Sequence, residues 1–235
     1  MPLFYQPELV ADAPALPADE SRHCVKVLRQ QVGDSIEVVD GRGTFYAGTI
    51  TQADPKRCLF EITRSWSEPA LPYAVHLIIA PTKNLDRTEW LVEKAVEIGI
   101  DELSFVRCEH SERRVLKTDR LIKKAVAAMK QSGRATLPTI NELRPLAHFL
   151  TPPAEGVPLQ RLMAYVDPTN PAHLAQVARP GSSYAVLVGP EGGFSEREVA
   201  QATAAQYQLV SLGPYRFRTE TAGLMVCAAL QLINE

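Results

Sequence analysis

Residues 187–199 read LVGPEGGFSEREV, and they set the expectation for most of the chain. Their branched apolar residues stop at Gly189-Pro190, where a bare glycine turn begins. Ser195 followed three residues later by Glu198 is a capping-box pattern, which predicts a helix over 196–206. A buried strand, a tight turn and a helix in succession form the repeating unit of a parallel α/β sheet.

The alternation of strand and helix patterns continues over residues 74–235. Helical patterns begin at Asp86, where Glu89 completes a capping box, and at Asp119, and a last helix over 219–235 is apolar on more than one face. The expected fold class is therefore α/β with a mostly parallel sheet. Continuous apolar runs predict its buried strands, at 75–80, 103–106, 161–167, 184–189 and 207–213.

Residues 1–70 have a different pattern, which is typical of short strands. VGDSIEVVDGRGTFYAGTI alternates on both sides of the turn signal Asp-Gly-Arg-Gly at 40–43. A short helix over 19–31 precedes it, with Asp19 or Ser21 as its cap and with Val25 and Leu28 facing inward. These pieces predict a small β-barrel.

The boundary between the two patterns falls in the stretch SEPALPY, residues 67–73. Its two prolines restrict the preceding residues and interrupt both helices and strand ladders, which is typical of a linker. We therefore predict two domains, a β-barrel over 1–70 and an α/β domain over 71–235.

The composition limits the possible classes of protein. Of the 235 residues, 46% are hydrophobic and 22% are charged, which is ordinary for a globular protein. No basic and apolar leader opens the chain and no apolar run reaches about 18 residues, so neither a signal peptide nor a membrane span is expected. The four cysteines are far apart and form no CxxC or Cys/His cluster, so no metal site is expected. We expect a soluble, cytoplasmic protein with reduced thiols.

Positive charge is concentrated in residues 107–134, RCEHSERRVLKTDRLIKKAVAAMKQSGR. This block holds nine Lys and Arg against three Asp and Glu, a local charge of +6. Because the whole chain carries −2, the remainder carries −8. One basic block on an acidic chain indicates a face that meets phosphates. A solvated helix surface explains the block equally well when it is taken alone.

The glycine turn at 189–193 indicates a ligand site, because ligands of open α/β sheets bind at the carboxyl ends of strands. Residues 212–218 follow the next predicted strand, and we expect the two strands to be neighbours whose turns share one slot. The phosphate-loop pattern GxxxxGK[ST] is absent, Glu191 would repel an anion, and no GxGxxG opens a helix. Bare backbone, apolar walls and a carboxylate suit a neutral or cationic adenosyl cofactor such as S-adenosyl-L-methionine. A tight loop that needs glycine only for its backbone angles is the alternative.

Two segments, LVGPEGGFSEREV and LGPYRFRTETA at 212–222, together resemble the signatures of the RsmE family, SPOUT-class methyltransferases of small-subunit ribosomal RNA. Further segments agree along nearly the whole chain. HCVKVLRQQVGDSIEVVDGRG resembles the family's N-terminal PUA-like barrel, EKAVEIGI its first α/β unit, and SERRV and QSGRATLP its basic middle.

The resemblance implies a deep trefoil knot in the α/β domain and an obligate homodimer. It also implies methyl transfer from S-adenosyl-L-methionine to N3 of a uridine in 16S ribosomal RNA, uridine 1498 in the family, with the barrel binding RNA. A SPOUT methyltransferase acting on transfer RNA or on another ribosomal site would have the same fold. A non-catalytic RNA-binding adaptor is the alternative from a different class.

The resemblance assigns roles to residues of the two signatures. Uridine N3 must lose its proton, and the negative charge must be stabilised, which we assign to Arg218 with Arg216 as substitute. The alternative for Arg218 is a structural ion pair with Glu220. The base is Glu220, Glu191 or solvent. The expected cofactor-binding residues are Leu187, Gly189, Pro190, Glu191, Gly192, Leu212, Gly213, Tyr215, Phe217, Arg218 and Thr219.

Basic side chains outside the signatures are the candidates for binding RNA. Each of them, taken alone, also fits a solvated surface charge, and the family resemblance favours them as a set. A uridine turned out of its stack would bind against an aromatic ring, which Tyr215 or Phe217 could provide. The expected RNA-binding residues are Arg22, Arg29, Lys83, Arg113, Arg114 and Arg134.

Overall fold

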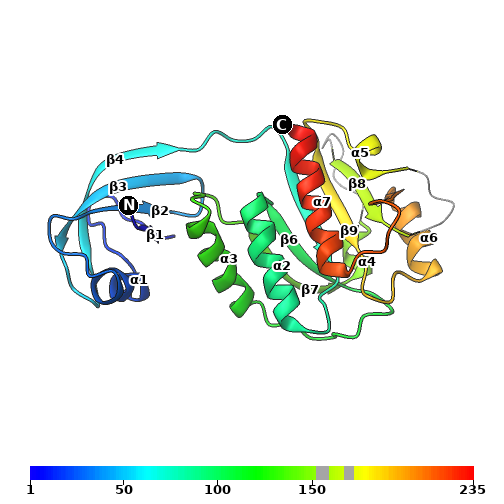
Figure 1. Ribbon diagram of the computed structural model, residues 1–235, viewed down its shortest axis with the longest axis horizontal. Helices are drawn as coiled ribbons and strands as arrows, with labels where there is room; N and C mark the ends of the chain where they lie inside the picture. The colour runs from blue at the N-terminus through cyan, green and yellow to red at the C-terminus, as the bar shows by residue number, and fades with distance from the viewer. Residues whose placement is uncertain (152–158, 167–171) are drawn as a thin grey trace. The chain divides into compact units, whose positions relative to one another are not determined.

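The computed structural model describes residues 1–151, 159–166 and 172–235, and it divides into two compact units (Figure 1). The first unit comprises Met1–Ala70 together with Val126–Leu137, and the second comprises Leu71–Ala125 and Pro138–Glu235. Each unit contains its own sheet and its own hydrophobic core. Among the described residues, no helix is long and apolar enough to cross a membrane.

The first unit contains a four-stranded sheet in the order β1-β2-β3-β4. Strands β2 and β3 are antiparallel and are joined by the predicted turn. Oδ1 of Asp40 accepts hydrogen bonds from the backbone N of Arg42 at 2.7 Å and of Thr44 at 3.1 Å, and Gly41 and Gly43 adopt positive φ, which glycine tolerates best. Closure of this sheet into a barrel stays a prediction. The strands are β1 (Leu3–Tyr5), β2 (Ser35–Val39), β3 (Thr44–Gln52) and β4 (Leu59–Ser67).

The predicted short helix is present as α1 (Ala18–Arg22), which continues into a π-helical segment, His23–Val27. The predicted caps are wrong, because Pro17 is the N-cap and makes no side-chain cap hydrogen bond. Ser21 is buried instead, and its Oγ donates to the carbonyl of Leu16 and accepts from the backbone N of Cys58. Leu28 is 38% exposed, so its predicted inward position is wrong as well.

Residues 126–137 belong to the first compact unit, although they lie far beyond the predicted boundary at residue 70. They contain the end of α3 (Asp119–Gln131) and the chain that follows it. The backbone N of Gly43 donates to Ala135 O at 3.1 Å, and Leu137 N donates to Gly41 O at 2.9 Å. These long-range hydrogen bonds attach the segment to the β2–β3 turn, which no local sequence pattern indicates.

The second unit contains a six-stranded sheet in the order β10-β8-β9-β5-β6-β7, and every pair in it is parallel. The α/β class is confirmed, with all five predicted strands present. β7 was missed because its mostly exposed sequence, TINELRP, has no apolar run. The predicted end of the third strand, Asp167, lies outside the described residues. The strands are β5 (Ala74–Ile79), β6 (Glu102–Arg107), β7 (Thr139–Pro145), β8 (Leu159–Ala164), β9 (Ser183–Val188) and β10 (Gln208–Val210).

The strand order corrects one expectation about the site. Strands β9 and β10 are not neighbours, because β8 lies between them and pairs with both. The neighbour of β9 on its other side is β5. The chain therefore builds β5, β6 and β7 outward in one direction and then returns to place β8, β9 and β10 on the other side of β5. The carboxyl ends of β5 and β9 meet at the centre of the sheet, where ligands of such sheets bind.

Two long helices, α2 (Leu85–Ile98) and α7 (Thr219–Asn234), lie side by side on one face of this sheet (Figure 1). Gly223 allows α7 to approach closely, since a Cβ there would lie 2.7 Å from Ile79 Cδ1 and 3.0 Å from Leu91 Cδ1. The predicted end of α2 at Gly99 is confirmed, with φ of 114°. Its predicted start is corrected, because Asn84 is the N-cap and its side chain accepts from Asp86 N.

The opposite face of the sheet is buried in a second hydrophobic core. Its core includes Ile78, Val106, Leu187 and Phe194, together with residues of α4 (Leu146–Phe149) and α6 (Glu196–Ala204). The predicted capping box of α6 is confirmed. Burial on both faces explains why the central strands are continuous apolar runs rather than alternating ones. A short helix, α5 (Leu174–Val177), packs against α7.

Candidate active site

The turn after β9 is held tightly by its surroundings. A Cβ on Gly189 would lie 2.9 Å from the ring of Phe194, and one on Gly192 would lie 2.9 Å from Cβ of His110. Gly193 has φ of 73° with open space beside it, so it is required for its backbone angle. Two of the glycines therefore provide room for neighbouring side chains, and one provides a left-handed turn.

Loops from β5 and β6 close around this turn. The backbone N of Lys83, after β5, donates to Oε1 of Glu191 at 3.2 Å. Nδ1 of His110, after β6, lies 3.2 Å from the carbonyl oxygen of Gly193. Arg113 joins the two loops, because its guanidinium donates to Thr82 O at 3.1 Å and to Lys83 O at 2.6 Å. The three loops form one hydrogen-bonded assembly at the carboxyl edge of the sheet.

The start of α7 completes this assembly. Oγ1 of Thr219 donates to the carbonyl of Gly189 at 3.2 Å, which brings the second signature onto the first despite the strand between them. Glu220 is buried, and its Oε1 lies 3.7 Å from Nε of Arg87. The alternative ion pair between Arg218 and Glu220 is therefore replaced by a pair with α2. Oε2 of Glu220 is buried and accepts no hydrogen bond from the described part of the chain.

Residues 214–218 are all exposed, whereas only Glu191 and Gly192 of the first turn are. The side chain of Tyr215 is 78% exposed and that of Phe217 is 38% exposed. Arg218 is the N-cap residue of α7. Within residues 1–151, 159–166 and 172–235, neither Arg216 nor Arg218 has a carboxylate within 4 Å. Both guanidinium groups are therefore available to an incoming negative charge.

The structure places four of the eleven expected cofactor-binding residues in the hydrogen-bonded assembly, and the other seven lie outside it. Gly189, Glu191, Gly192 and Thr219 belong to the assembly described above. Leu187 is wholly buried in the core of the sheet and Pro190 is also buried. Leu212, Gly213, Tyr215, Phe217 and Arg218 lie on the segment after β10, where Gly213 N donates to Oγ of Ser211 at 3.1 Å.

The charges around the site are partly compensated. Nζ of Lys83 lies 2.7 Å from Oε2 of Glu112, and this hydrogen bond raises the pKa of the Lys83 ammonium group. Burial raises the pKa of the Cys108 thiol, which keeps it protonated and unreactive. In the described part of the chain, no group of three or more His, Cys, Asp or Glu residues is placed to hold a metal ion.

The expected RNA-binding residues fall into two groups. Lys83, Arg113 and Arg114 belong to the second unit, where Arg113 is used to hold the loops and Arg114 is exposed. The other three belong to the first unit: Arg22 on α1, Arg29, and Arg134 after α3.

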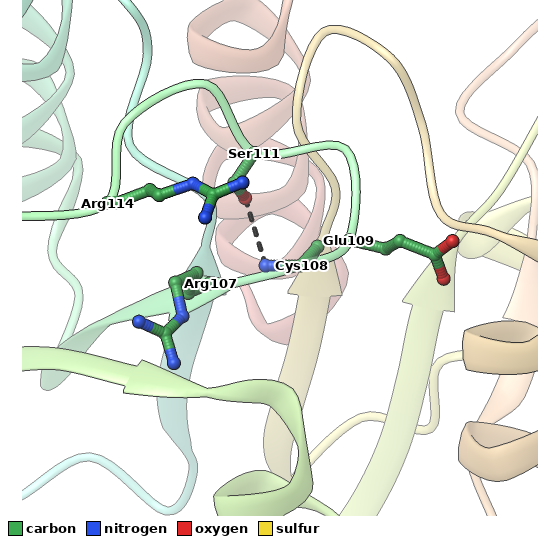
Figure 2. Close-up of a pocket in the computed structure, with 5 residues that line it drawn as sticks. All are labelled: Arg107, Cys108, Glu109, Ser111 and Arg114. Atoms are coloured by element: carbon green, nitrogen blue, oxygen red, sulfur yellow. Dashed lines mark hydrogen bonds between the residues drawn. The ribbon is translucent and has the colours of Figure 1, made fainter.

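Sequence reasoning missed Arg107, which lines a pocket of about 340 Å³ together with Cys108, Glu109, Ser111 and Arg114 (Figure 2). An adjoining pocket of about 330 Å³ shares Arg107 and Arg114 and is also lined by residues 115–116 and 142–145. Arg107 directly follows a predicted strand, and that position was the available signal. His110 and Arg87 were also missed, because their roles come from contacts with distant loops and helices.

Two family models match the chain. A family model described as an RNA methyltransferase domain matches residues 69–231, and one described as an RNA methyltransferase PUA domain matches residues 16–63. The chain therefore belongs to the RNA methyltransferase family.

Individual relatives indicate the substrate class within this family. A protein of Aquifex aeolicus named ribosomal RNA small subunit methyltransferase E is 28% identical, over 98% of this chain and 99% of its own length. The crystal structure of a probable rRNA-methyltransferase from Porphyromonas gingivalis is 40% identical, with a TM-score of 0.90 and coverage of 99% of both chains. The structure of ribosomal RNA small subunit methyltransferase E from Neisseria gonorrhoeae, bound to S-adenosyl methionine, is 29% identical, with a TM-score of 0.88 and coverage of 100% of this chain and 98% of the other. The resemblance to the RsmE family is confirmed.

Proposed function

We propose that this protein transfers a methyl group from S-adenosyl-L-methionine to N3 of a uridine in the 16S RNA of the small ribosomal subunit, uridine 1498 by resemblance. The observation that carries the proposal is the contact between the two signatures, where Thr219 donates to Gly189 O. The full-length likeness to small-subunit methyltransferases from Aquifex aeolicus and Neisseria gonorrhoeae supports the ribosomal substrate.

The cofactor fits the central turn of the sheet. Residues 189–193 offer backbone groups that are already positioned by their neighbours, and a preformed site loses little entropy when a ligand binds. Glu191 is a carboxylate beside the turn and suits the positive charge of a sulfonium or amino group. The cofactor bound in the Neisseria gonorrhoeae relative supports this assignment.

Arg218 is the residue we assign to the transition state. Removal of the N3 proton spreads negative charge onto O2 and O4 of the uracil ring, and a positioned cation stabilises that charge as it develops. Arg218 lies one residue before Thr219, which contacts the cofactor turn, whereas Arg216 lies two residues further away. Arg216 is therefore the substitute, and the exposed ring of Tyr215 or Phe217 provides a surface for stacking.

Glu220 is the carboxylate we favour as the base. Its Oε2 is buried without a partner in the described residues, while Oε1 of Glu191 already accepts from Lys83. Glu220→Gln should lower kcat at saturating cofactor, because the carboxylate that takes the N3 proton is lost. An unchanged kcat in this variant would assign the proton to solvent.

The remaining assignments follow from the family. The first unit and its basic residues bind RNA, and the second unit binds the cofactor, carries a trefoil knot of the SPOUT class and dimerises. The apolar side chains of Met225 and Leu232, which α7 exposes by 40% and 70%, support a homodimer through this helix. A ribosomal substrate places the enzyme in the cytoplasm, and the proposed chemistry requires no metal.

The test is transfer of labelled methyl from S-adenosyl-L-methionine to small ribosomal subunits, followed by nucleoside mapping of the RNA. Label in 3-methyluridine of 16S RNA is expected. Label in transfer RNA or at another ribosomal nucleotide would show a related methyltransferase instead. RNA binding without transfer to any RNA would show an adaptor.

A further inference from the structure

Two pockets at the carboxyl end of β6 share a pair of arginines. Arg107, the last residue of β6, and Arg114, in the loop that follows, line both of them. Figure 2 shows the two side chains on the same side of the loop, one below the other. The shared lining makes this a single site with two compartments.

The two arginines form no ion pair with the described residues of the chain. In the described residues, neither Arg107 nor Arg114 has a carboxylate within 4 Å, although nearby basic residues such as Lys83 and Arg144 do. Glu109 is the acidic residue that lines the same compartment, and its carboxylate points away from both guanidinium groups (Figure 2). The compartment therefore presents two guanidinium groups that no carboxylate of the described residues pairs with within 4 Å.

The loop that carries Arg114 is fixed before any ligand arrives. Cys108 N donates to Oγ of Ser111 at 2.9 Å, and Glu109 N donates to Oε1 of Glu198 at 2.8 Å. Arg113 anchors the far end of the loop to the carbonyls of Thr82 and Lys83. A loop fixed at three places loses little entropy when the pocket is filled.

The chemistry of the two compartments differs. Two guanidinium groups suit a phosphate, whose oxygens accept paired hydrogen bonds from each planar fork. The second compartment is lined by the apolar side chains of Val115, Leu116, Leu143 and Pro145 and by the ion pair of Glu142 and Arg144. Its apolar side chains suit the face of a base. The combination fits one nucleotide unit, with its phosphodiester at the arginines and its base against the apolar wall.

We propose that the Arg107–Arg114 pocket binds a phosphodiester and the attached nucleoside of the substrate RNA. This inference rests on the proposed function for the identity of the RNA. The position of the pocket supports this proposal, because the loop that carries Arg114 also contacts the cofactor turn, through His110 and Gly193. The bound nucleotide would be a neighbour of the target uridine in the strand, held beside the site where the methyl group is transferred.

The experiment measures the affinity of the full-length protein for 16S RNA fragments at several salt concentrations. The double variant Arg107→Ala/Arg114→Ala should bind about 10- to 100-fold more weakly, since each lost hydrogen bond is charge-assisted. The slope of log affinity against log salt should decrease by about 1 for each phosphate contact removed. Arg197→Ala, which removes an exposed arginine from α6, is the matched control and should change little.

Two further measurements keep the outcome interpretable. Cofactor affinity by calorimetry reports whether the variants are folded, and Arg107→Lys/Arg114→Lys keeps the charge while removing the paired hydrogen bonds. The lysine variant should bind RNA with intermediate affinity. The proposal is overturned if the alanine double variant matches Arg197→Ala in affinity and salt slope while it still binds cofactor.

Inorganic phosphate distinguishes the sources of the anion. Phosphate should compete with RNA for the wild-type protein and lose that effect in the alanine double variant. If phosphate binds the pocket but RNA affinity does not depend on Arg107 and Arg114, the pocket serves a free anion and the proposal fails. These binding readouts do not require methyl transfer, so failure of the proposed function is recognised separately, by the absence of label in RNA.

Discussion

The two glycine-containing signatures lie in the same unit, yet they differ in how firmly they are held. Residues 189–193 are fixed by Phe194, by His110 and by hydrogen bonds from Lys83 and Thr219. Residues 214–218 are exposed, and the side chains of both their arginines are without carboxylate partners among the described residues. The difference indicates a division of labour, in which the first segment positions a ligand through its backbone and the second supplies side chains to the reaction.

Substitution of Arg218 should have the largest effect. Arg218→Ala should lower kcat by about 10²- to 10³-fold, because a positioned donor to the developing charge is lost. Cofactor affinity should change far less, since the first signature holds the cofactor. The measurement combines single-turnover methyl transfer with calorimetry of cofactor binding.

Arg216→Ala is the matched control for this comparison, because it removes an equally exposed arginine from the same segment. It should lower kcat only a few-fold. Equal losses in the two variants would contradict the assignment of Arg218 and would indicate that the segment acts through its overall charge.

Substitutions in the first signature should have intermediate effects, of two different kinds. Gly192→Ala introduces a Cβ at 2.9 Å from Cβ of His110, and such overpacking typically costs about 1–3 kcal/mol. Gly193→Ala meets no neighbour but forces alanine to φ of 73°, which costs about 1–2 kcal/mol. Both should weaken cofactor binding, measured by calorimetry.

His110→Gly separates these two causes, because it removes the Cβ against which the new methyl group at position 192 would be packed. The double variant Gly192→Ala/His110→Gly should bind cofactor more tightly than Gly192→Ala alone. The same second substitution should not improve Gly193→Ala. Rescue of both variants would show that His110 acts on the whole turn and not on the space at Gly192.

The hydrogen bond between the two signatures should contribute least to cofactor affinity. Thr219→Val removes the hydrogen bond to Gly189 O with little change of shape, at a cost of about 1 kcal/mol, or roughly fivefold in cofactor affinity. Thr219→Ser keeps the hydroxyl and should bind cofactor as the wild type does. If Val and Ser at this position behave alike, the link between the signatures is not energetically significant.

Local patterns predicted many elements of the second unit correctly. The capping box of Ser195 and Glu198, the end of α2 at Gly99 and the buried strands were all read from short windows, because each depends on neighbours in the chain. Where a pattern was weak, the prediction failed. The edge strand β7 is largely exposed and polar, and the cap of α2 is Asn84 and not Asp86.

Contacts between distant segments were beyond these patterns. Three features depend on side chains from separate elements. They are the pairing of Glu220 with Arg87, the hydrogen bonds by which Arg113 joins two loops, and the pocket lined by Arg107 and Arg114. The prediction that β9 and β10 are neighbours was wrong for the same reason, since the order of strands in the sequence does not determine their order in the sheet.

The sequence by itself determined the two signature segments, the local strands and helices that carry them, and the family to which the chain belongs. These features depend on residue types at short spacings. Helix caps, glycine turns and apolar runs are patterns of this kind, so they can be recognised in the sequence. Only the tertiary structure decided that β8 separates β9 from β10 and that Thr219 nevertheless reaches Gly189. The physical reason is that parallel strands are joined by long crossovers, so their order is set by packing of the whole sheet and not by any single stretch of chain.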